Sequence, residues 1–178
     1  MFRMYLQHKN NFDRVTIEVK EYNDEFDDET SVISDICKYL HQTGDIDFIV
    51  SGFGSERWPV DCKFDLPLII RELPEIIQNL NINEYNFCLG FYEQGVMREI
   101  IFSDGDDGKL QLECKSLMHG WSPSPSCIIM EKSTVKKMIE ELFGNFIAYS
   151  QMVCPELMSE KLFKDWIFRY NISYIFNA

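Results

Sequence analysis

The side chains best suited to nucleophilic catalysis or metal binding are few in this sequence and widely spaced. The three histidines, His8, His41 and His119, lack the close spacing of zinc ligand pairs. His119 precedes Cys127 by eight residues, which would allow a Cys–His nucleophile pair. Cys127, however, falls in an apolar segment that predicts a strand, where burial would raise the pKa of its thiol and make it inert. We therefore interpret His119 as a loop residue and Cys127 as a core residue.

The sequence motifs of nucleotide-binding and metal-binding loops are absent. No segment has the glycine pattern of a phosphate or dinucleotide loop, and no Gly-x-Ser-x-Gly elbow occurs. Residues 104–108 are rich in Asp and Gly, but the positions where a calcium loop needs Gly and Glu hold Lys109 and Lys115. We interpret this segment as a hairpin turn, and we expect no metal and no cofactor. Carboxylates are so numerous that an enzyme with a dispersed active site remains an alternative.

The cysteines and the N-terminal residues predict the compartment. None of the six cysteines forms a Cys-x-x-Cys pair, which favours buried free thiols in a reducing environment. The first residues lack the apolar stretch and cleavage site of a signal peptide. No apolar run approaches the length of about 18 residues that is typical of a membrane span. The sequence therefore predicts a cytoplasmic protein without a membrane segment.

The charge of the chain restricts its partners. Acidic residues number 29 and basic residues 17, for a net charge of −12. This balance opposes binding to nucleic acid and to anionic membranes, because both require clustered Lys and Arg. It favours solubility and attraction to a basic protein.

The acidity is concentrated in residues 21–29, six of which are acidic, and the turn at 104–107 is a second acidic group. The segment 21–29 is either a solvated loop whose last members favour a helix N-terminus, or a docking surface for a basic protein. Trp58 and Trp121 lie beside prolines in predicted loops, where they either anchor an interface or cover an end of the core. The candidate partner-binding residues are Glu21, Asp24, Glu25, Asp27, Asp28, Asp104, Asp106, Asp107, Trp58 and Trp121.

Periodicity in the first half of the chain predicts strands and two helices. Residues 2–7 and 15–20 alternate apolar and polar side chains, which predicts two strands joined by a hairpin turn. Thr30 or Ser31 is expected to cap a helix that ends at Gly44, and a strand follows at 46–50. Asp65 is expected to cap a second helix, which Pro74 should kink or split.

The second half predicts four strands and then helices. Strands are expected at 85–92, 97–102, 110–114 and 127–130, and the short turns between the first three favour antiparallel pairing. Ser133 or Thr134 is expected to cap a long helix, and Pro155 to start a final one. This order predicts an α+β fold: a mainly antiparallel sheet with a central meander, packed by about four helices, two of them C-terminal. The length fits a single domain spanning residues 1–178.

Three segments carry a resemblance to a known class of proteins. They are residues 52–61 (GFGSERWPVD), the apolar helix 66–77, and residues 91–95 (FYEQG) followed by 98–102 (REIIF). With its acidity and size, the chain resembles an immunity protein of a bacterial contact-dependent growth inhibition system, encoded beside a polymorphic toxin. The resemblance covers about residues 46–170.

The resemblance implies a non-enzymatic, cytoplasmic protein that binds and neutralises a cognate toxin domain. It also implies that the partner is basic, most simply a nuclease, blocked at its active site or at an adjacent surface. Fast electrostatic steering would then assist association. The alternatives are an enzyme with a dispersed site and an acidic regulatory domain with an unrelated partner.

Overall fold

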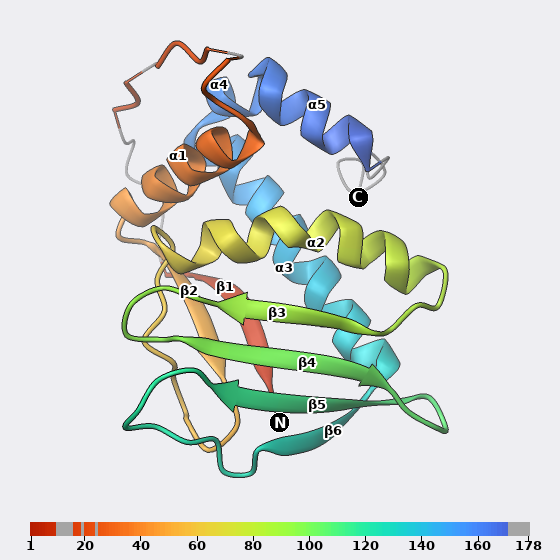
Figure 1. Ribbon diagram of the computed structural model, residues 1–178. Coiled ribbons are helices and arrows are strands. Elements are labelled where there is room, and N and C mark those ends of the chain that lie inside the picture. Colours follow the sequence, from red (N-terminus) through yellow and green to blue (C-terminus); the bar gives the residue numbers. More distant parts are fainter. Residues whose placement is uncertain (10–15, 19, 24, 171–178) are drawn as a thin grey trace.

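The computed structural model describes residues 1–9, 16–18, 20–23 and 25–170, and it shows an α+β fold (Figure 1). Its strands are β1 (Arg3–His8), β2 (Ile46–Ser51), β3 (Phe87–Phe91), β4 (Arg98–Asp104), β5 (Lys109–Ser116) and β6 (Cys127–Glu131). Its helices are α1 (Glu29–Gln42), α2 (Asp65–Asn81), α3 (Lys132–Val153), α4 (Pro155–Met158) and α5 (Lys161–Arg169). None of these helices has the length and apolar character needed to cross a bilayer.

The strands β3, β4, β5 and β6 form an antiparallel meander, as predicted. Each strand pairs with the next along the chain, so that Leu89 lies opposite Ile100, and Ile100 opposite Cys114. Short turns allow only this arrangement, since a parallel crossover requires a dozen or more residues. The alternation of side chains along β4 directs Ile100 and Phe102 into the core.

The partner of β1 differs from the prediction. β1 pairs antiparallel with β2, with Met4 opposite Val50 and Leu6 opposite Phe48. The predicted second strand of a hairpin, residues 15–20, is not a strand in its described part (16–18 and 20), while Val15 and Val19 lie outside the described residues. Alternation of apolar and polar side chains predicted the strand β1. It could not predict the partner strand, because that depends on the tertiary structure.

The helices lie beyond the β3 edge of the meander and behind it (Figure 1). α2 lies along β3, α3 runs behind the meander and packs against β1, and α1, α4 and α5 gather at the end remote from β6. One continuous apolar cluster joins side chains from both sheets and all of these helices. Phe48 of β2 and Phe91 of β3 stack within it, with ring centroids 6.5 Å apart.

Several helix boundaries were predicted inaccurately. The N-cap of α1 is Asp28, whose carboxylate accepts hydrogen bonds from the backbone of Thr30 and Ser31, the two residues predicted as caps. The N-cap of α2 is Phe64, so the predicted cap Asp65 is instead the first helical residue. α2 continues through Pro74 to Asn81, so Pro74 does not split the helix.

The C-terminal helices also differ from the prediction. α3 begins at Lys132, with Glu131 as its N-cap, rather than after Ser133 or Thr134. Pro155 does start a helix, but that helix ends at Met158, and a separate helix begins at Lys161. The single final helix that the apolar spacing predicted is therefore two helices.

Candidate functional site

Three loops meet at the left-hand end of the meander in Figure 1. They comprise residues 52–64, 92–97 and 117–126, and we call them together the loop end. The amide of Ser124 donates to the carbonyl of Phe53 at 2.9 Å, and the amide of Leu117 donates to the carbonyl of Met97 at 2.8 Å. Gly54, at φ +84°, lies so close to the Ser124 carbonyl that a Cβ would collide with it. Backbone hydrogen bonds thus connect the loop 117–126 to each of the other two loops.

Arg98 lies at the centre of the loop end, between two tryptophans. It starts β4, and its guanidinium carbon lies 3.6 Å from the ring centroid of Trp121 and 4.4 Å from that of Trp58. The two indoles are 6.0 Å apart and nearly perpendicular. The fold therefore brings together two of the residues that the sequence marked as candidates, Trp58 and Trp121, around a third that it did not.

The two tryptophans have different roles. Trp58 is fully buried against Phe2 and Phe91, and its indole Nε1 donates to the carbonyl of Gly52 at 3.2 Å. Trp121 is half-buried at the outside of the stack. Trp58 thus covers an end of the core, while Trp121 is the wall of the arginine site that faces outward.

The positive charge of Arg98 has no partner within the described residues. The side chain is only 5% exposed, and its Nε and Nη1 are buried without a hydrogen-bond partner. Burial accordingly lowers the pKa of the guanidinium. Burying an ion costs several kcal/mol, whereas a desolvated cation–π contact returns about 2 kcal/mol. The two tryptophans therefore offset much of this cost, but they provide no hydrogen-bond acceptor for the buried N–H groups.

An acidic groove of about 490 Å³ lies next to the loop end, between α2 and the meander. Its carboxylates are Glu72 and Glu75 of α2 and Glu99 of β4, and Tyr92 closes it at the loop end. Within the described part of the chain, none of these three carboxylates forms an ion pair. The remaining lining residues are Ile76, Asn79, Asn86, Phe87, Cys88 and Gly90.

Burial, together with neighbouring carboxylates, raises the pKa values of groups in the acidic groove. Burial raises the pKa of Glu72, with Arg71 opposing and Glu75 reinforcing that shift. Partial burial of the thiol, followed by the charge of Glu99, raises the pKa of Cys88 to about 12, although the residue as a whole is exposed. Each shift disfavours a negative charge, so a cation in the groove would relieve the repulsion.

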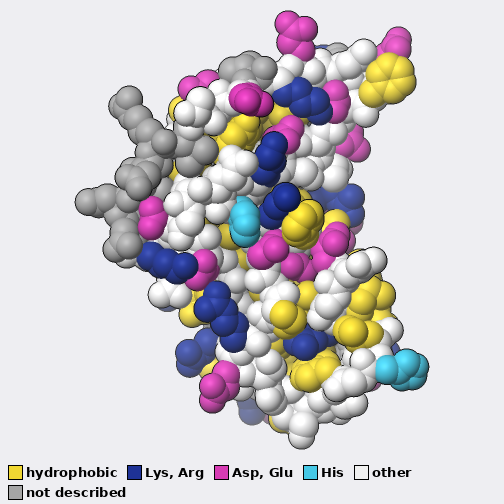
Figure 2. Space-filling view, turned by 90° about the vertical axis from the view of Figure 1, so that its left-hand side faces the viewer, with side chains coloured by type: hydrophobic (Ala, Val, Ile, Leu, Met, Phe, Trp, Pro, Cys, Tyr) yellow, Lys and Arg dark blue, Asp and Glu magenta, His cyan; other side chains and the backbone are white. Residues whose placement is uncertain are grey.

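Tyr92 connects the acidic groove to the loop end. Its ring covers Gly90, where a Cβ would overlap it, and its hydroxyl donates to Glu99 at 3.2 Å. Burial and this hydrogen bond raise the pKa of Tyr92. The side chain is still 50% exposed, and the loop end carries three more exposed apolar side chains, Phe64, Leu117 and Met118. Figure 2 looks onto this end and shows hydrophobic side chains gathered in its lower half, with acidic ones grouped above them.

Three of the six acidic residues of the segment 21–29, namely Asp27, Asp28 and Glu29, form contacts inside the protein. Asp27 accepts from Lys20 at 2.9 Å and Asp28 caps α1, so both have structural roles. Glu21 and Glu25 are exposed, and Asp24 lies outside the described residues. The interpretation as a helix-capping loop is thus supported at Asp28.

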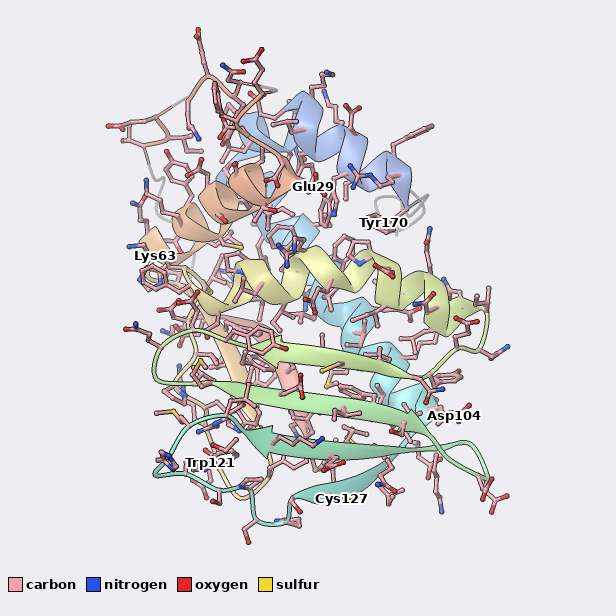
Figure 3. All side chains as sticks on the ribbon, viewed as in Figure 1. Glu29, Lys63, Asp104, Trp121, Cys127 and Tyr170 are labelled. Atoms are coloured by element: carbon pink, nitrogen blue, oxygen red, sulfur yellow. The ribbon has the colours of Figure 1, made fainter. Side chains whose placement is uncertain are left out.

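The acidic turn at 104–107 lies elsewhere. Asp104 forms an ion pair with Lys132, while Asp106 and Asp107 are exposed. Figure 3 shows Asp104 at the opposite end of the meander from Trp121, and remote from Glu29 at the start of α1. The two acidic groups that the sequence singled out therefore do not form one surface.

The cysteines partly contradict the prediction that all are buried. Cys37, Cys62, Cys114 and Cys154 are buried free thiols, but Cys88 and Cys127 are exposed. Cys127 is in a strand, as expected, yet it lies on the open face of the meander rather than in the core. No group of three or more His, Cys, Asp or Glu side chains among the described residues is arranged to hold a metal ion.

Comparison with protein-family models, with curated proteins and with solved structures finds no match to this chain.

The sequence contained a signal for Arg98 but none for the acidic groove. Arg98 shares the inward alternation of Ile100 and Phe102, which makes it a charged residue at a core position. Glu72 and Glu75 meet Glu99 only because α2 packs along β3. No local pattern in the sequence predicts that contact.

Proposed function

We propose that this protein is an immunity protein, which binds a cognate basic toxin domain in the cytosol and neutralises it. The observation that carries the proposal is the acidic groove, which the exposed Tyr92 closes at the loop end. A partner's Lys or Arg fits between Glu72, Glu75 and Glu99, and an apolar side chain of the partner packs on Tyr92. Burying that cation masks part of the partner's own basic surface.

The combination of charge and apolar surface suits tight binding better than charge alone. Protection against a toxin requires a dissociation constant on the order of nM, or about −12 kcal/mol. Interfaces of that strength have a central aromatic or aliphatic anchor inside a polar rim. Tyr92, Leu117 and Met118 supply the apolar part, and the groove carboxylates supply an acidic rim.

Co-expression tests the proposal. The chain is produced together with the toxin domain encoded by the neighbouring gene, and growth and co-purification are measured. The expected result is restored growth and a 1:1 complex. A pair that neither co-purifies nor restores growth would refute the proposal.

A dispersed-site enzyme is the second candidate, because several ionisable groups converge in the acidic groove. Its Cys88 thiol, with a pKa of about 12, is a poor nucleophile near neutral pH. Titration of the toxin's activity separates the two candidates. An immunity protein abolishes the toxin's activity at a 1:1 ratio. An enzyme that inactivates the toxin does so at ratios far below 1:1.

A further inference from the structure

Arg98 differs from the cations of this protein that form ion pairs. Arg57 and Lys9 share Asp47, Arg169 pairs with Glu29, and Lys132 pairs with Asp104. These are partly exposed side chains, for which water already screens the charge. The buried Arg98 is the one that most needs an anion, and no acidic side chain of the described residues pairs with it. An internal counter-charge would be expected at such a position unless the anion comes from outside.

A guanidinium donates hydrogen bonds in its own plane, along its N–H edges. Trp121 and Trp58 occupy its surroundings at 3.6 Å and 4.4 Å, so an acceptor must approach its N–H edges. Nε contributes to one edge of the guanidinium and Nη1 to the other, and neither has a hydrogen-bond partner among the described residues. Both atoms are buried, so an acceptor from outside reaches them only where the half-buried Trp121 gives way. A carboxylate matches such an edge, because its two oxygens accept two parallel N–H bonds.

We propose that Arg98 is a receptor for a carboxylate of the protein partner, which reaches it beside Trp121. This inference rests on the proposed function and names a second, oppositely charged contact in the same interface. Trp121 is the side of approach because it is half-buried, whereas Trp58 is enclosed by the core. The exposed Leu117 and Met118 of the same loop provide apolar surface that would exclude water around the ion pair.

The surrounding charge favours a carboxylate over a phosphate. The chain has a net charge of −12, and Glu99 follows Arg98 directly on the strand. A phosphate group carries up to two negative charges, so these carboxylates repel it more strongly than they repel a carboxylate. A partner with one cation for the acidic groove and one carboxylate for Arg98 is also fixed in orientation, because reversing it would oppose like charges.

The test uses the full chain and sodium acetate as the probe. Sodium chloride at equal ionic strength serves as the reference, and the indole N–H resonances of the tryptophans are recorded. The expected result is a saturable shift of the Trp58 and Trp121 resonances. Trp166 of α5 packs on Phe143 and Phe163 and serves as an internal control that does not move.

Two Arg→Met variants test whether Arg98 is the residue that binds acetate. Arg98→Met should abolish the acetate response, whereas Arg57→Met, which removes an exposed arginine of the loop end, should retain it. Unchanged circular dichroism confirms that each variant is folded. Absence of a saturable response in the wild type, or an equal response in Arg98→Met, would overturn the inference.

The toxin partner provides the second arm of the test. Arg98→Met should weaken toxin binding by about tenfold or more, and Arg98→Lys should restore it only in part, because Lys lacks the two-donor edge. Equal toxin binding by wild type and Arg98→Met would reject the carboxylate receptor and leave the immunity function standing. Acetate binding at Arg98 without any toxin binding would instead reject the immunity function alone.

Discussion

Arg98 and Glu99 are neighbours on β4, yet their side chains lie on opposite faces of the meander. Arg98 is buried between Trp58 and Trp121, and Glu99 faces the acidic groove, where it accepts a hydrogen bond from Tyr92. Strand alternation produces this separation, because successive side chains point to opposite faces. One strand end therefore presents a carboxylate on one face and, on the other, a cation that has no ion pair within the described part of the chain.

The carboxylates of the acidic groove should control association with the basic partner. Replacing Glu72, Glu75 and Glu99 together by Gln should slow association about tenfold, because electrostatic steering can raise on-rates by 10-fold or more. Stopped-flow fluorescence or surface plasmon resonance measures the rate. Raising the ionic strength from about 0.05 to about 0.5 M should slow the wild type and reduce the difference, since screening shortens the range of exposed charges.

A control with the same change in net charge is available at the other end of the meander. It replaces Glu84, Asp106 and Asp107, all exposed, by Gln or Asn. Its association rate should stay close to that of the wild type. Equal slowing by both triple variants would mean that net charge, not the acidic groove, sets the rate.

Asp65 should make the stability of the protein decrease as the pH rises. Burial raises its pKa to about 6 from an ordinary 3.8, although the amide of Asp61 donates to it. Between these pH values the folded state keeps a proton that the unfolded state has lost. The free energy of unfolding therefore falls across this window as the pH increases.

Asp65→Asn removes that titration. At pH 7 it should raise the free energy of unfolding by about 1–3 kcal/mol, since each unit of pKa shift corresponds to about 1.4 kcal/mol. Urea unfolding at several pH values measures the effect, and Asp106→Asn provides an exposed control. If the difference between wild type and Asp65→Asn does not vary with pH, Asp65 is not raised in pKa.

Asp28 should be a structural residue of the acidic segment. Asp28→Ala removes two hydrogen bonds at the N-terminus of α1 and should lower the free energy of unfolding by about 1 kcal/mol. Glu25→Ala, at an exposed neighbour, should change it by less than about 0.5 kcal/mol. Urea unfolding compares the two. Slower toxin association in a Glu21→Gln, Glu25→Gln variant of normal stability would restore the docking interpretation for this segment.

Arg98 should contribute little to stability despite its burial. Arg98→Met should leave the free energy of unfolding within about 1 kcal/mol of the wild type, or raise it, because apolar replacements of buried charges are often neutral or stabilising. Phe91→Ala, at an apolar position of the same core, should lower it by about 3–5 kcal/mol. A loss above about 2 kcal/mol in Arg98→Met would show that the guanidinium is compensated within the protein.

Local patterns in the sequence determined most element types, with the strand expected at 15–20 as an exception in its described part. The alternation at Ile100 and Phe102 predicted the inward face of β4, and the short turns around it predicted the meander. The apolar spacing of Leu66, Ile69 and Leu73 predicted the buried face of α2. These signals can be read from sequence because periods of 2 and 3.6 residues arise within each element.

Only the tertiary structure decided which elements meet. It paired β1 with β2, placed Trp121 against Trp58 around Arg98, and set α2 along β3 so that Glu72 faces the same groove as Glu99. It also separated the acidic segment from the turn at Asp104. These contacts join residues far apart in the chain, and they depend on how all the apolar faces are buried together, which no local period specifies.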